Sequence, residues 1–378
     1  MCFTADMTKK KPHQKTKKKP GKNIFLGLTS RVLMIISASL LVVSSLSFLV
    51  NPARVWLISL LGLAFIPLLA VNIVLLIMAV VRRSKAIVIP LVAILPCLFF
   101  LGRYVQLPSD EELQEMKPDL KVISYNLGRF SLNNKEDGIS NRAQCADSVF
   151  AYLKKHDADI ICLQEFYVSK KDVNTLKKYI RRNFPGYKPE YFMFHGRYGS
   201  FGNVTLSRIQ VLGKGVVKFE ESANLAIYTD HKVGERRFRV YNCHFESYNI
   251  SFTGMIRSLF RSGTDVFSET GIKMKKSISR RPKQVDKVFS HIEDCPYEAF
   301  VCGDFNDNPM SYTYFRMTRG RQDAFVKAGD GFGATYSRLW PFLRIDYVLV
   351  PDRFKATGFD VPRVGYSDHY PVVAEIKF

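Results

Sequence analysis

The sequence is poor in cysteine and tryptophan, and it holds far fewer acidic than basic residues. Its 378 residues include only 7 cysteines and 2 tryptophans. The cysteines form no CxxC pair and show no regular spacing, which argues against a paired-cysteine framework and indicates small buried hydrophobic side chains. The cysteines therefore do not indicate whether the protein works in an oxidising or a reducing compartment. No internal repeat is evident, and only the lysine-rich start of the chain is of low complexity.

The shortage of acidic residues makes the chain strongly basic. Lys and Arg number 55 against 34 Asp and Glu, which gives a formal net charge of +21. Residues 1–31 carry +8 of this charge, residues 32–118 carry +2 and residues 119–378 carry +11. A basic C-terminal domain suits an anionic substrate or an anionic membrane surface, but charge by itself selects neither.

Acidic residues are missing altogether from three apolar runs, residues 32–50, 55–81 and 86–101. A helix needs about 20 apolar residues to cross a bilayer core, so the first two runs are long enough. The third run is shorter and contains Pro90 and Pro96, so a re-entrant or interfacial segment is the alternative to a third span. A cleaved signal peptide does not fit the first run, which is too long and lacks a small-residue cleavage site before the next run. We therefore predict an anchor of two to three transmembrane helices.

Basic residues predict the orientation of this anchor. The lysine-rich leader and the group Arg82-Arg83-Ser84-Lys85 are both expected to stay in the cytoplasm. Three spans then make the chain an integral protein of the cytoplasmic membrane, with a cytoplasmic N terminus and its C-terminal domain on the outer face. The expected parts are a leader at 1–31, the anchor at 32–101, a polar linker at 102–118 and a catalytic domain at 119–378.

From residue 119 onward the pattern changes to short apolar runs separated by turns. Strands bounded by Gly, Asn, Asp and Pro are predicted at residues 120–125, 160–164, 238–244, 299–302, 345–350 and 372–376. Apolar residues at helical spacing predict helices at 142–156, 171–183 and 281–292. Many strands with a few helices between strand pairs predict an α/β sandwich of two sheets flanked by helices.

Polar residues with catalytic potential follow these predicted strands. They are Asn126, Glu165, His244, Asp304, Asn306, Asp346, Asp368 and His369. A carboxylate such as Glu165 suits Mg²⁺, a hard cation that prefers oxygen ligands and neutralises phosphate oxygens. A histidine paired with an aspartate can transfer protons near neutral pH, and an asparagine can donate to developing negative charge. The combination predicts hydrolysis of a phosphate ester.

The motifs around these residues resemble those of the endonuclease/exonuclease/phosphatase superfamily, which has the deoxyribonuclease I-like fold. In order they are Tyr125-Asn126, Leu163-Gln164-Glu165, His244, Gly303-Asp304-Phe305-Asn306-Asp307, Arg344-Ile345-Asp346-Tyr347 and Ser367-Asp368-His369-Tyr370-Pro371. The resemblance covers residues 119–378, and Gly-Asp-Phe-Asn and Ser-Asp-His are its most specific parts. It implies a four-layer α/β sandwich of two mixed β-sheets flanked by helices.

The resemblance also implies a metal site. Glu165 is the expected main ligand, Asn126 the support of the metal–water shell and Asp368 a further contact, with Mg²⁺ as the cofactor and Mn²⁺ as its alternative. Abasic-site endonucleases usually carry an acidic residue two positions after the asparagine, where this chain has Gly128. This departure argues against that repair function and favours a single-metal site centred on Glu165.

Five further residues take catalytic roles by the same resemblance. His369 is expected to contact the scissile phosphate, and Asp346 to orient it. Asp304 positions or deprotonates the attacking water, and Asn306 stabilises the transition state. His244 binds a phosphate oxygen or assists the leaving group. Family members differ in which group is the formal base.

Basic residues outside the motifs are candidate substrate contacts. Arg208 is a minor candidate whose simplest role is structural. Residues 257–283 hold eight basic residues against two acidic ones, and Lys275, Arg280 and Arg281 are the candidates there. They suit an anionic substrate, an anionic lipid surface or nucleic acid, although the aromatics between them are too few to indicate base stacking. The alternative for this stretch is a solvated variable loop.

The function predicted from sequence is a membrane-anchored, divalent-metal-dependent phosphoesterase. Its substrate is a phosphodiester or phosphomonoester in a lipid headgroup, a phosphorylated metabolite or a nucleic acid. The alternatives are a membrane-tethered endonuclease and a non-catalytic binding module, although such a module predicts an eroded site and all eight polar residues are present. The expected partners are the phosphorylated substrate and membrane lipids, with nucleic acid as an alternative and no protein partner.

Overall fold

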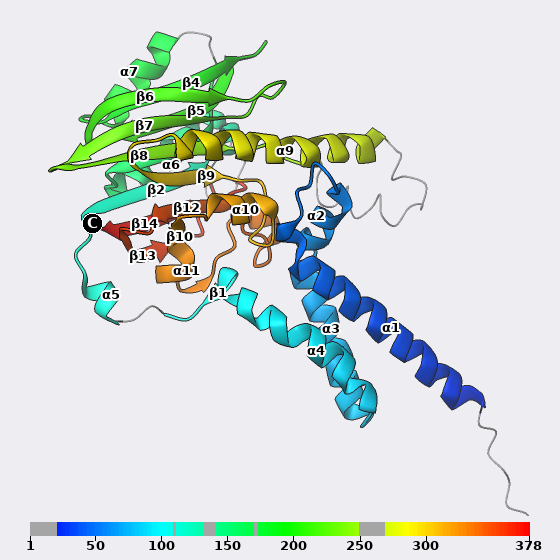
Figure 1. Ribbon diagram of the computed structural model, residues 1–378. Coiled ribbons are helices and arrows are strands. Elements are labelled where there is room, and N and C mark those ends of the chain that lie inside the picture. Colours follow the sequence, from blue (N-terminus) through cyan, green and yellow to red (C-terminus); the bar gives the residue numbers. More distant parts are fainter. Residues whose placement is uncertain (1–20, 109–110, 132–138, 140, 170–172, 249–268) are drawn as a thin grey trace, which may run out of the picture.

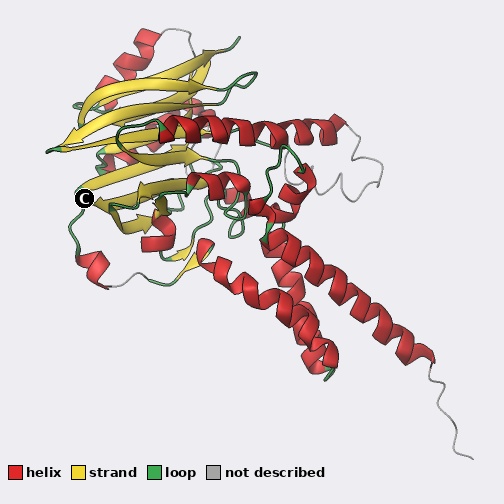
Figure 2. Cartoon of the chain, viewed as in Figure 1, coloured by secondary structure: helices red, strands yellow, loops and turns green. Residues whose placement is uncertain are grey.

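Helices at the N-terminal end project from an α/β domain that contains the long strands (Figure 1). The computed structural model describes residues 21–108, 111–131, 139, 141–169, 173–248 and 269–378. Figure 2 shows the division clearly, because the described chain is helical up to the short strand β1 (Val105–Gln106).

The α/β domain is built on two six-stranded sheets. In order across the first sheet lie β13 (Lys355–Asp360), β14 (Val372–Lys377), β2 (Leu120–Asn126), β3 (Ile160–Val168), β5 (Ser200–Ser207) and β4 (Lys188–His195). In order across the second lie β10 (Arg321–Asp323), β12 (Asp346–Pro351), β9 (Glu298–Asp304), β8 (Arg236–His244), β7 (Leu225–Val233) and β6 (Gln210–Lys218). Only β2–β3 and β8–β9 pair in parallel within these sheets, so both are mixed.

Helices cover the outer faces of both sheets. The helices are α6 (Arg142–His156) and α7 (Val173–Asn183) on the first sheet, and α9 (Glu269–Glu293) and α10 (Tyr312–Met317) on the second. Two short helices, α5 (Glu111–Glu115) and α11 (Ala324–Ala328), lie near β13. The arrangement is the predicted four-layer sandwich of two mixed sheets flanked by helices.

Alternation along β2 shows why this segment is a buried strand. Val122 faces the layer between the sheets, whereas Ile123 and Tyr125 face α6. Successive side chains of a strand point to opposite faces, so an almost unbroken apolar run fits a strand buried on both sides. The helix α6 begins where the side-chain oxygen of Asn141 accepts hydrogen bonds from the backbone N–H groups of Ala143 and Gln144.

A buried polar network joins the two sheets close to the functional residues. The Gln164 amide donates to Asn242 Oδ1 at 2.8 Å and to Ser124 Oγ at 3.1 Å. The Asn242 amide donates to the carbonyl of Val204 at 3.1 Å. Leaving such groups unpaired would cost about 1–3 kcal/mol each, so the network fixes how β3 and β8 face each other.

The described part of the N-terminal region, residues 21–104, is built mainly from four α-helices joined by short 3-10 turns. The four helices are α1 (Gly21–Ser45), α2 (Trp56–Leu63), α3 (Phe65–Val81) and α4 (Val88–Cys97), which continues in a 3-10 turn (Leu98–Arg103). Leu28–Ser45 and Lys85–Arg103 are long and apolar enough to cross a membrane, and α2 and α3 together would be a third span bent by 60°. The third apolar run thus lies within a helical segment of 19 residues, Lys85–Arg103, which extends beyond the uncharged residues 86–101 at both ends.

The N-terminal helices are bound to the domain through the loop that follows β9. The Ser47 hydroxyl donates to the carbonyl of Met310 at 2.7 Å, and the Arg103 guanidinium donates to the carbonyl of Pro309 at 2.9 Å. The Asn308 amide donates to the carbonyl of Gly62 at 2.9 Å. These contacts place α2 and the end of α4 directly beside a loop that starts at one of the predicted catalytic residues.

Several element boundaries differ from those expected from sequence. α1 begins at Gly21, within the expected leader, and the expected linker contains β1, which pairs with β11 (Gly331–Phe332). α9 begins at Glu269 instead of residue 281, because Pro282 is accommodated inside the helix. Part of the basic stretch 257–283 lies outside the described residues.

Candidate functional site

Strand ends from both sheets bring the predicted catalytic residues to one rim of the sandwich. Asn126 ends β2, His244 ends β8 and Asp304 ends β9. Asp346 begins β12 directly opposite Asp304 in the antiparallel register. His369 lies shortly before β14, which pairs with β2, so it reaches the same rim.

The carboxylate of Asp304 is the hub of this cluster. Its Oδ2 accepts hydrogen bonds from the amides of Asn126 at 2.8 Å and Asn306 at 3.1 Å, and its Oδ1 accepts from the backbone N–H of Asn306 at 2.7 Å. Oδ2 also lies 3.7 Å from His244 Nε2 and 3.9 Å from His369 Nε2. Burial and the nearby Asp346 raise the pKa of Asp304. A buried carboxylate held in this way suits the exchange of a proton.

His369 and Asp346 form a buried pair beside Asp304. His369 Nδ1 lies 2.9 Å from Asp346 Oδ2, which fixes the imidazole and directs Nε2 toward Asp304. Burial alone would lower the pKa of His369, but the charges of Asp346 and Asp304 raise it to about 10. The imidazole is therefore held as a cation, which suits contact with an anionic phosphate group.

Glu165 reaches the rim through an irregularity in its strand. The register between β3 and β5 shifts between Leu163 and Phe166, and Glu165 has a φ of 49°. The bulge lets Leu163 and Phe166 both face the core, although they are three residues apart, and turns the Glu165 carboxylate outward. Its Oε1 lies 3.8 Å from His244 Nε2.

Glycines at two positions allow the close approach of neighbouring loops. At Gly303, before Asp304, an added Cβ would lie 1.9 Å from the carbonyl oxygen of Cys243, so only glycine fits. Gly128 has a φ of 52°, and its Cβ would lie 3.0 Å from Asp368 Oδ1. A side chain at position 128 would thus have to displace the end of Asp368 and adopt a strained backbone conformation, which fits the glycine found there.

Oxygen atoms from Glu165, Asn126 and Asp368 offer ligands for a hard divalent cation. Among the described residues, Asp304, Asp346 and His369 bring their potential ligand atoms within 4.8 Å of one another. Within this trio Asp346 Oδ2 lies 2.9 Å from His369 Nδ1 and Asp304 Oδ2 lies 3.9 Å from its Nε2, an arrangement that fits proton transfer. Oxygen ligands on the Glu165 side fit Mg²⁺ or Mn²⁺.

Sequence reasoning missed Arg129, which borders Glu165. Arg129 Nε lies 3.1 Å from Glu165 Oε2, and its guanidinium stacks 4.2 Å from the ring centroid of Phe201. The ring of Tyr336 lies 5.3 Å from that of His369 and was missed as well. Neither lies in a recognised motif, and both reach the site through loops, so no pattern of spacing indicates them.

The four predicted substrate contacts lie in different surroundings. Lys275 is exposed on α9. Arg280, on the same helix, forms an ion pair with Glu221. Neither position conflicts with binding an anionic group at the surface of α9.

Arg281 and Arg208 both make structural contacts, which for Arg208 is the simplest role expected from sequence. Arg281 is buried, binds Asp307 at 3.0 Å and donates to a backbone carbonyl, so it holds α9 against the β9 loop instead of facing substrate. Arg208 forms ion pairs with Asp157 and Asp159, next to the start of β3, whereas Glu165 lies toward the other end of that strand. Arg208 is therefore a structural residue away from the rim.

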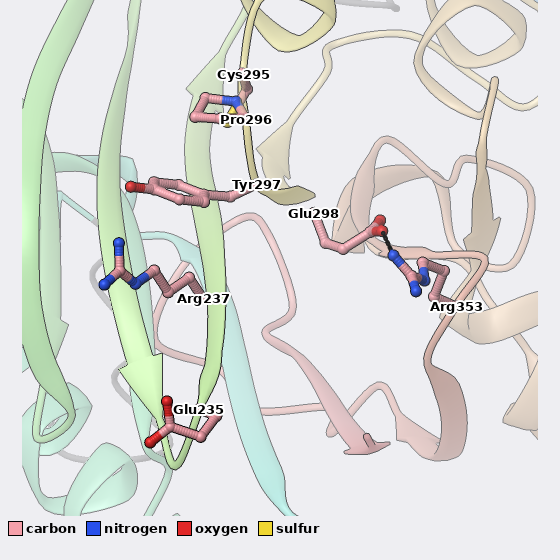
Figure 3. Close-up of a pocket in the computed structure, with 7 residues that line it drawn as sticks. All are labelled: Glu235, Arg237, Cys295, Pro296, Tyr297, Glu298 and Arg353. Carbon is pink, nitrogen blue, oxygen red and sulfur yellow. Dashed lines mark hydrogen bonds and ion pairs between the residues drawn. The ribbon is translucent and has the colours of Figure 1, made fainter.

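A pocket of about 960 Å³ opens beside the cluster. Asn126, Glu165, Asp304, Asn306, Asp368 and His369 all line it. A separate cavity of about 530 Å³ lies at the opposite ends of β8 and β9, between Arg237, Glu298 and Arg353 (Figure 3). It contains none of the predicted site residues, so the first pocket is the candidate active site.

Residues 123–369 match the sequence model of the Endonuclease/Exonuclease/phosphatase family. The chain belongs to this family. Membership makes it a hydrolase of phosphoester bonds in a family that commonly uses divalent metals. Residues 23–104 match a second model, a domain of unknown function (DUF8431). No curated protein matches the chain significantly.

Several solved structures are similar to this chain at low sequence identity. An endonuclease/exonuclease/phosphatase family protein from Leptotrichia buccalis is 13% identical, with a TM-score of 0.50 over 68% of this chain and 100% of that one. Humanized D. rerio TDP2 is 16% identical, with a TM-score of 0.49 over 68% and 99% of the two chains. The human Nocturnin catalytic domain is 15% identical, with a TM-score of 0.49 over 70% and 96%.

Proposed function

We propose that this protein is a membrane-anchored phosphoesterase that depends on a divalent metal and hydrolyses a phosphodiester or phosphomonoester. The observation that carries the proposal is the convergence of Glu165, Asp304 and the His369–Asp346 pair on one pocket. A metal-binding carboxylate, a proton acceptor and a fixed imidazolium are the groups that phosphate ester hydrolysis requires.

Glu165, with Asn126 and Asp368, would hold Mg²⁺, or alternatively Mn²⁺. The bound cation would neutralise phosphate oxygens and stabilise the leaving oxygen. The Arg129 guanidinium forms an ion pair with one carboxylate oxygen of Glu165 and so keeps that carboxylate oriented.

The remaining groups position the phosphate and move protons. Asp304 accepts a proton from the attacking water, and His369, oriented by Asp346, donates a hydrogen bond to a phosphate oxygen. His244 lies between Glu165 and Asp304, where it can reach a phosphate oxygen or the leaving group. The Asn306 amide donates to Asp304 and to the carbonyl of Phe245, so it acts here by orienting Asp304.

The N-terminal helices would anchor this hydrolase in the cytoplasmic membrane with the domain on its outer face. α1 ends beside the domain, and the turn between α3 and α4 lies on the side away from it (Figure 1). That turn contains Arg82, Arg83 and Lys85, and the lysine-rich leader precedes α1. The start of α1 and this turn lie on one side, away from the domain (Figure 1). The preference for basic residues on the cytoplasmic side makes that side cytoplasmic.

Nucleic acid hydrolysis is the second candidate function. Met274 lines the pocket, and the neighbouring Lys275 and Lys276 on α9 are exposed. Cationic side chains beside the pocket favour a polyanion, and the α/β domain is basic. A membrane-tethered endonuclease would bind with a steep dependence on salt concentration.

The test is to purify the full-length protein in lipid nanodiscs beside a His369→Ala variant. Both are assayed with Mg²⁺, Mn²⁺ or EDTA against plasmid DNA, RNA, phospholipid vesicles and soluble phosphate esters. We expect metal-dependent turnover of one substrate class that is lost in the variant and in EDTA. A folded wild-type protein that turns over nothing in this panel would support the non-catalytic binding module instead.

A further inference from the structure

The candidate active-site pocket is lined by a polar group of residues and an apolar group, which we call its polar end and its apolar end. Asp304, His369 and Glu165 form the polar end. The other end is lined by Leu60 and Leu63 of α2 and continues past the break between α2 and α3, where Ala64 and Pro67 also line it. One wall of the catalytic pocket therefore comes from the two helices that together form the bent candidate span.

The loop at 336–343 supplies another wall, and most of its lining side chains are apolar as well. Leu339, Phe342 and Leu343 line the pocket there, and Met274 of α9 adds another apolar side chain. Phe342 is 56% exposed, although it stands beside the catalytic cluster. A phosphate, a sugar or a nucleotide backbone would gain little from these side chains, whereas a hydrocarbon chain would bury them.

The apolar end lies where a membrane surface is expected. The last candidate span ends at Arg103, and β1 follows at once, with Val105 paired to Phe332 of β11. Trp340 packs against Phe332, and both aromatic rings are partly exposed. Exposed aromatic residues next to the end of a span are typical of the membrane–water interface. The loop at 336–343 thus joins the interface to the catalytic cluster.

We propose that the substrate is a membrane lipid with a phosphoester headgroup. The phosphoester lies at Asp304 and His369, and the adjoining hydrocarbon lies between α2–α3 and the loop at 336–343. The inference rests on the proposed function and names its substrate class. The reaction is hydrolysis: water oxygen bonds to phosphorus, one phosphorus–oxygen ester bond breaks, and the released alcohol oxygen takes up the proton.

The experiment measures kcat/KM against the length of an apolar tail. The full-length protein in phosphatidylcholine nanodiscs is given alkyl para-nitrophenyl phosphates from methyl to octyl, and the matching monoalkyl phosphates with detection of released phosphate. Each methylene that enters the apolar end should raise kcat/KM roughly fourfold. The Leu63→Trp variant fills that end, so the octyl-to-methyl ratio should fall by about tenfold or more.

Matched variants separate the pocket from simple partition into the bilayer. Ile73→Trp adds the same ring to α3 at a residue that is 41% exposed and does not line the pocket, so it should keep the wild-type ratio. Phe342→Ala removes an exposed side chain from the other wall and should lower the ratio without loss of core packing. It remains informative if Leu63→Trp fails to fold.

The outcomes distinguish the inference from the function on which it rests. Equal kcat/KM for methyl and octyl esters, or a ratio that neither pocket variant lowers, would overturn the lipid assignment and leave the phosphoesterase intact. A single-stranded oligonucleotide cleaved faster than every ester would also overturn it, in favour of nucleic acid. Absence of metal-dependent turnover of every compound by the folded protein would overturn the proposed function itself.

A final comparison separates a membrane lipid from a soluble amphiphile. Wild-type protein and the His369→Ala variant are placed in vesicles of host membrane lipids, and the lipids are followed by mass spectrometry. We expect a Mg²⁺-dependent loss of one phospholipid class with the wild type alone. Tail selectivity without any such loss would contradict the assignment to a membrane lipid.

Discussion

The side-chain amide of Asn308 donates a hydrogen bond to the backbone carbonyl of Gly62 at 2.9 Å. Asn308 follows Asp304 in the loop that leaves β9, and Gly62 is close to the end of α2. The same amide lies 3.3 Å from the hydroxyl of Tyr104, and Asn308 Oδ1 accepts from the N–H of Met310. The loop that follows Asp304, the proposed catalytic carboxylate, is therefore held by the N-terminal helices.

Replacement of Asn308 by alanine should weaken this attachment. Three hydrogen bonds at a buried position are lost, and partners left unpaired cost about 1–3 kcal/mol. We expect a lower thermal unfolding midpoint in nanodiscs together with a lower kcat, because Asp304 and Asn306 belong to the same loop. Asn183→Ala, which removes an amide at the end of α7, serves as the control. An unchanged kcat would show that the loop keeps its position without this contact.

Asp346→Asn should reduce catalysis while keeping the size of the side chain. The variant removes the negative charge of Asp346, whose Oδ2 lies 2.9 Å from His369 Nδ1 and holds the imidazolium in place. General acid–base groups contribute roughly 10²-fold to 10⁴-fold, and a loss of kcat within that range is expected. Steady-state kinetics with the best substrate measure it. Asp352→Asn, at an exposed aspartate just beyond the other end of β12, should behave like the wild type.

Glu165→Gln should weaken metal binding. Loss of the main carboxylate ligand is expected to raise the Mg²⁺ concentration for half-maximal activity by at least about tenfold. Binding can also be followed without turnover, because Mg²⁺ at about 100 times its Kd stabilises a protein by about 2.7 kcal/mol. The thermal stabilisation should diminish in the variant but persist in Glu190→Gln, whose carboxylate binds Lys214. Equal stabilisation in both variants would remove Glu165 from the metal site.

His231 should make stability depend on pH. Burial lowers the pKa of His231 from 6.5 to about 4, so the unfolded chain binds the extra proton between these values. The stability that neutral His231 contributes is thus fully present above about pH 6.5 and is lost as the pH falls to about 4, a total of about 3 kcal/mol.

Thermal unfolding followed by circular dichroism at about pH 7.5 and about pH 5 measures this dependence. His231 Nε2 lies 2.7 Å from the hydroxyl of Thr229. In the His231→Gln variant the glutamine amide can still form a hydrogen bond with that hydroxyl, but it does not titrate in this range. We expect the drop in unfolding midpoint between the two pH values to be smaller in the variant. An identical drop would assign the pH dependence to other groups.

The membrane topology can be tested with reporters at the two ends of the chain. A reporter active only outside the cytoplasm should work at the C terminus, and one active only in the cytoplasm should work at the N terminus. The prediction follows from three crossings with the basic segments on one side. A C terminus that behaves as cytoplasmic would mean that one of the three segments does not span.

Local sequence was sufficient for the strands that carry the site. Apolar runs with a polar residue at the end predicted β2, β8 and β9, and they placed Asn126, His244 and Asp304 at one rim. β8 and β9 are parallel neighbours, so their carboxyl ends lie at the same edge of one sheet, whereas the packing of the two sheets brings the end of β2 to that rim. The hairpin β6–β7 was not predicted, because β6 has almost no buried residues and its sequence, with Gly213 and Gly215 among charged and apolar residues, lacks a continuous apolar run.

Basic residues show where local sequence was insufficient. Arg281 and Lys275 lie in one charged stretch, yet the first is buried against Asp307 and the second is exposed. On a helix, a few residues of spacing separate the covered face from the solvent face, and which face is covered depends on what packs there. The sequence of residues 257–283 does not reveal which segment packs against this helix.

By itself, the sequence determined the family, the four-layer sandwich and the residues able to do the chemistry, because these depend on short motifs and on alternation within single strands. Only the tertiary structure decided which groups surround them. It brought Gly62 to Asn308, 246 positions apart, and gave the catalytic pocket a wall made by Leu60 and Leu63. Contacts between distant segments depend on how whole elements pack, and no local pattern records that packing.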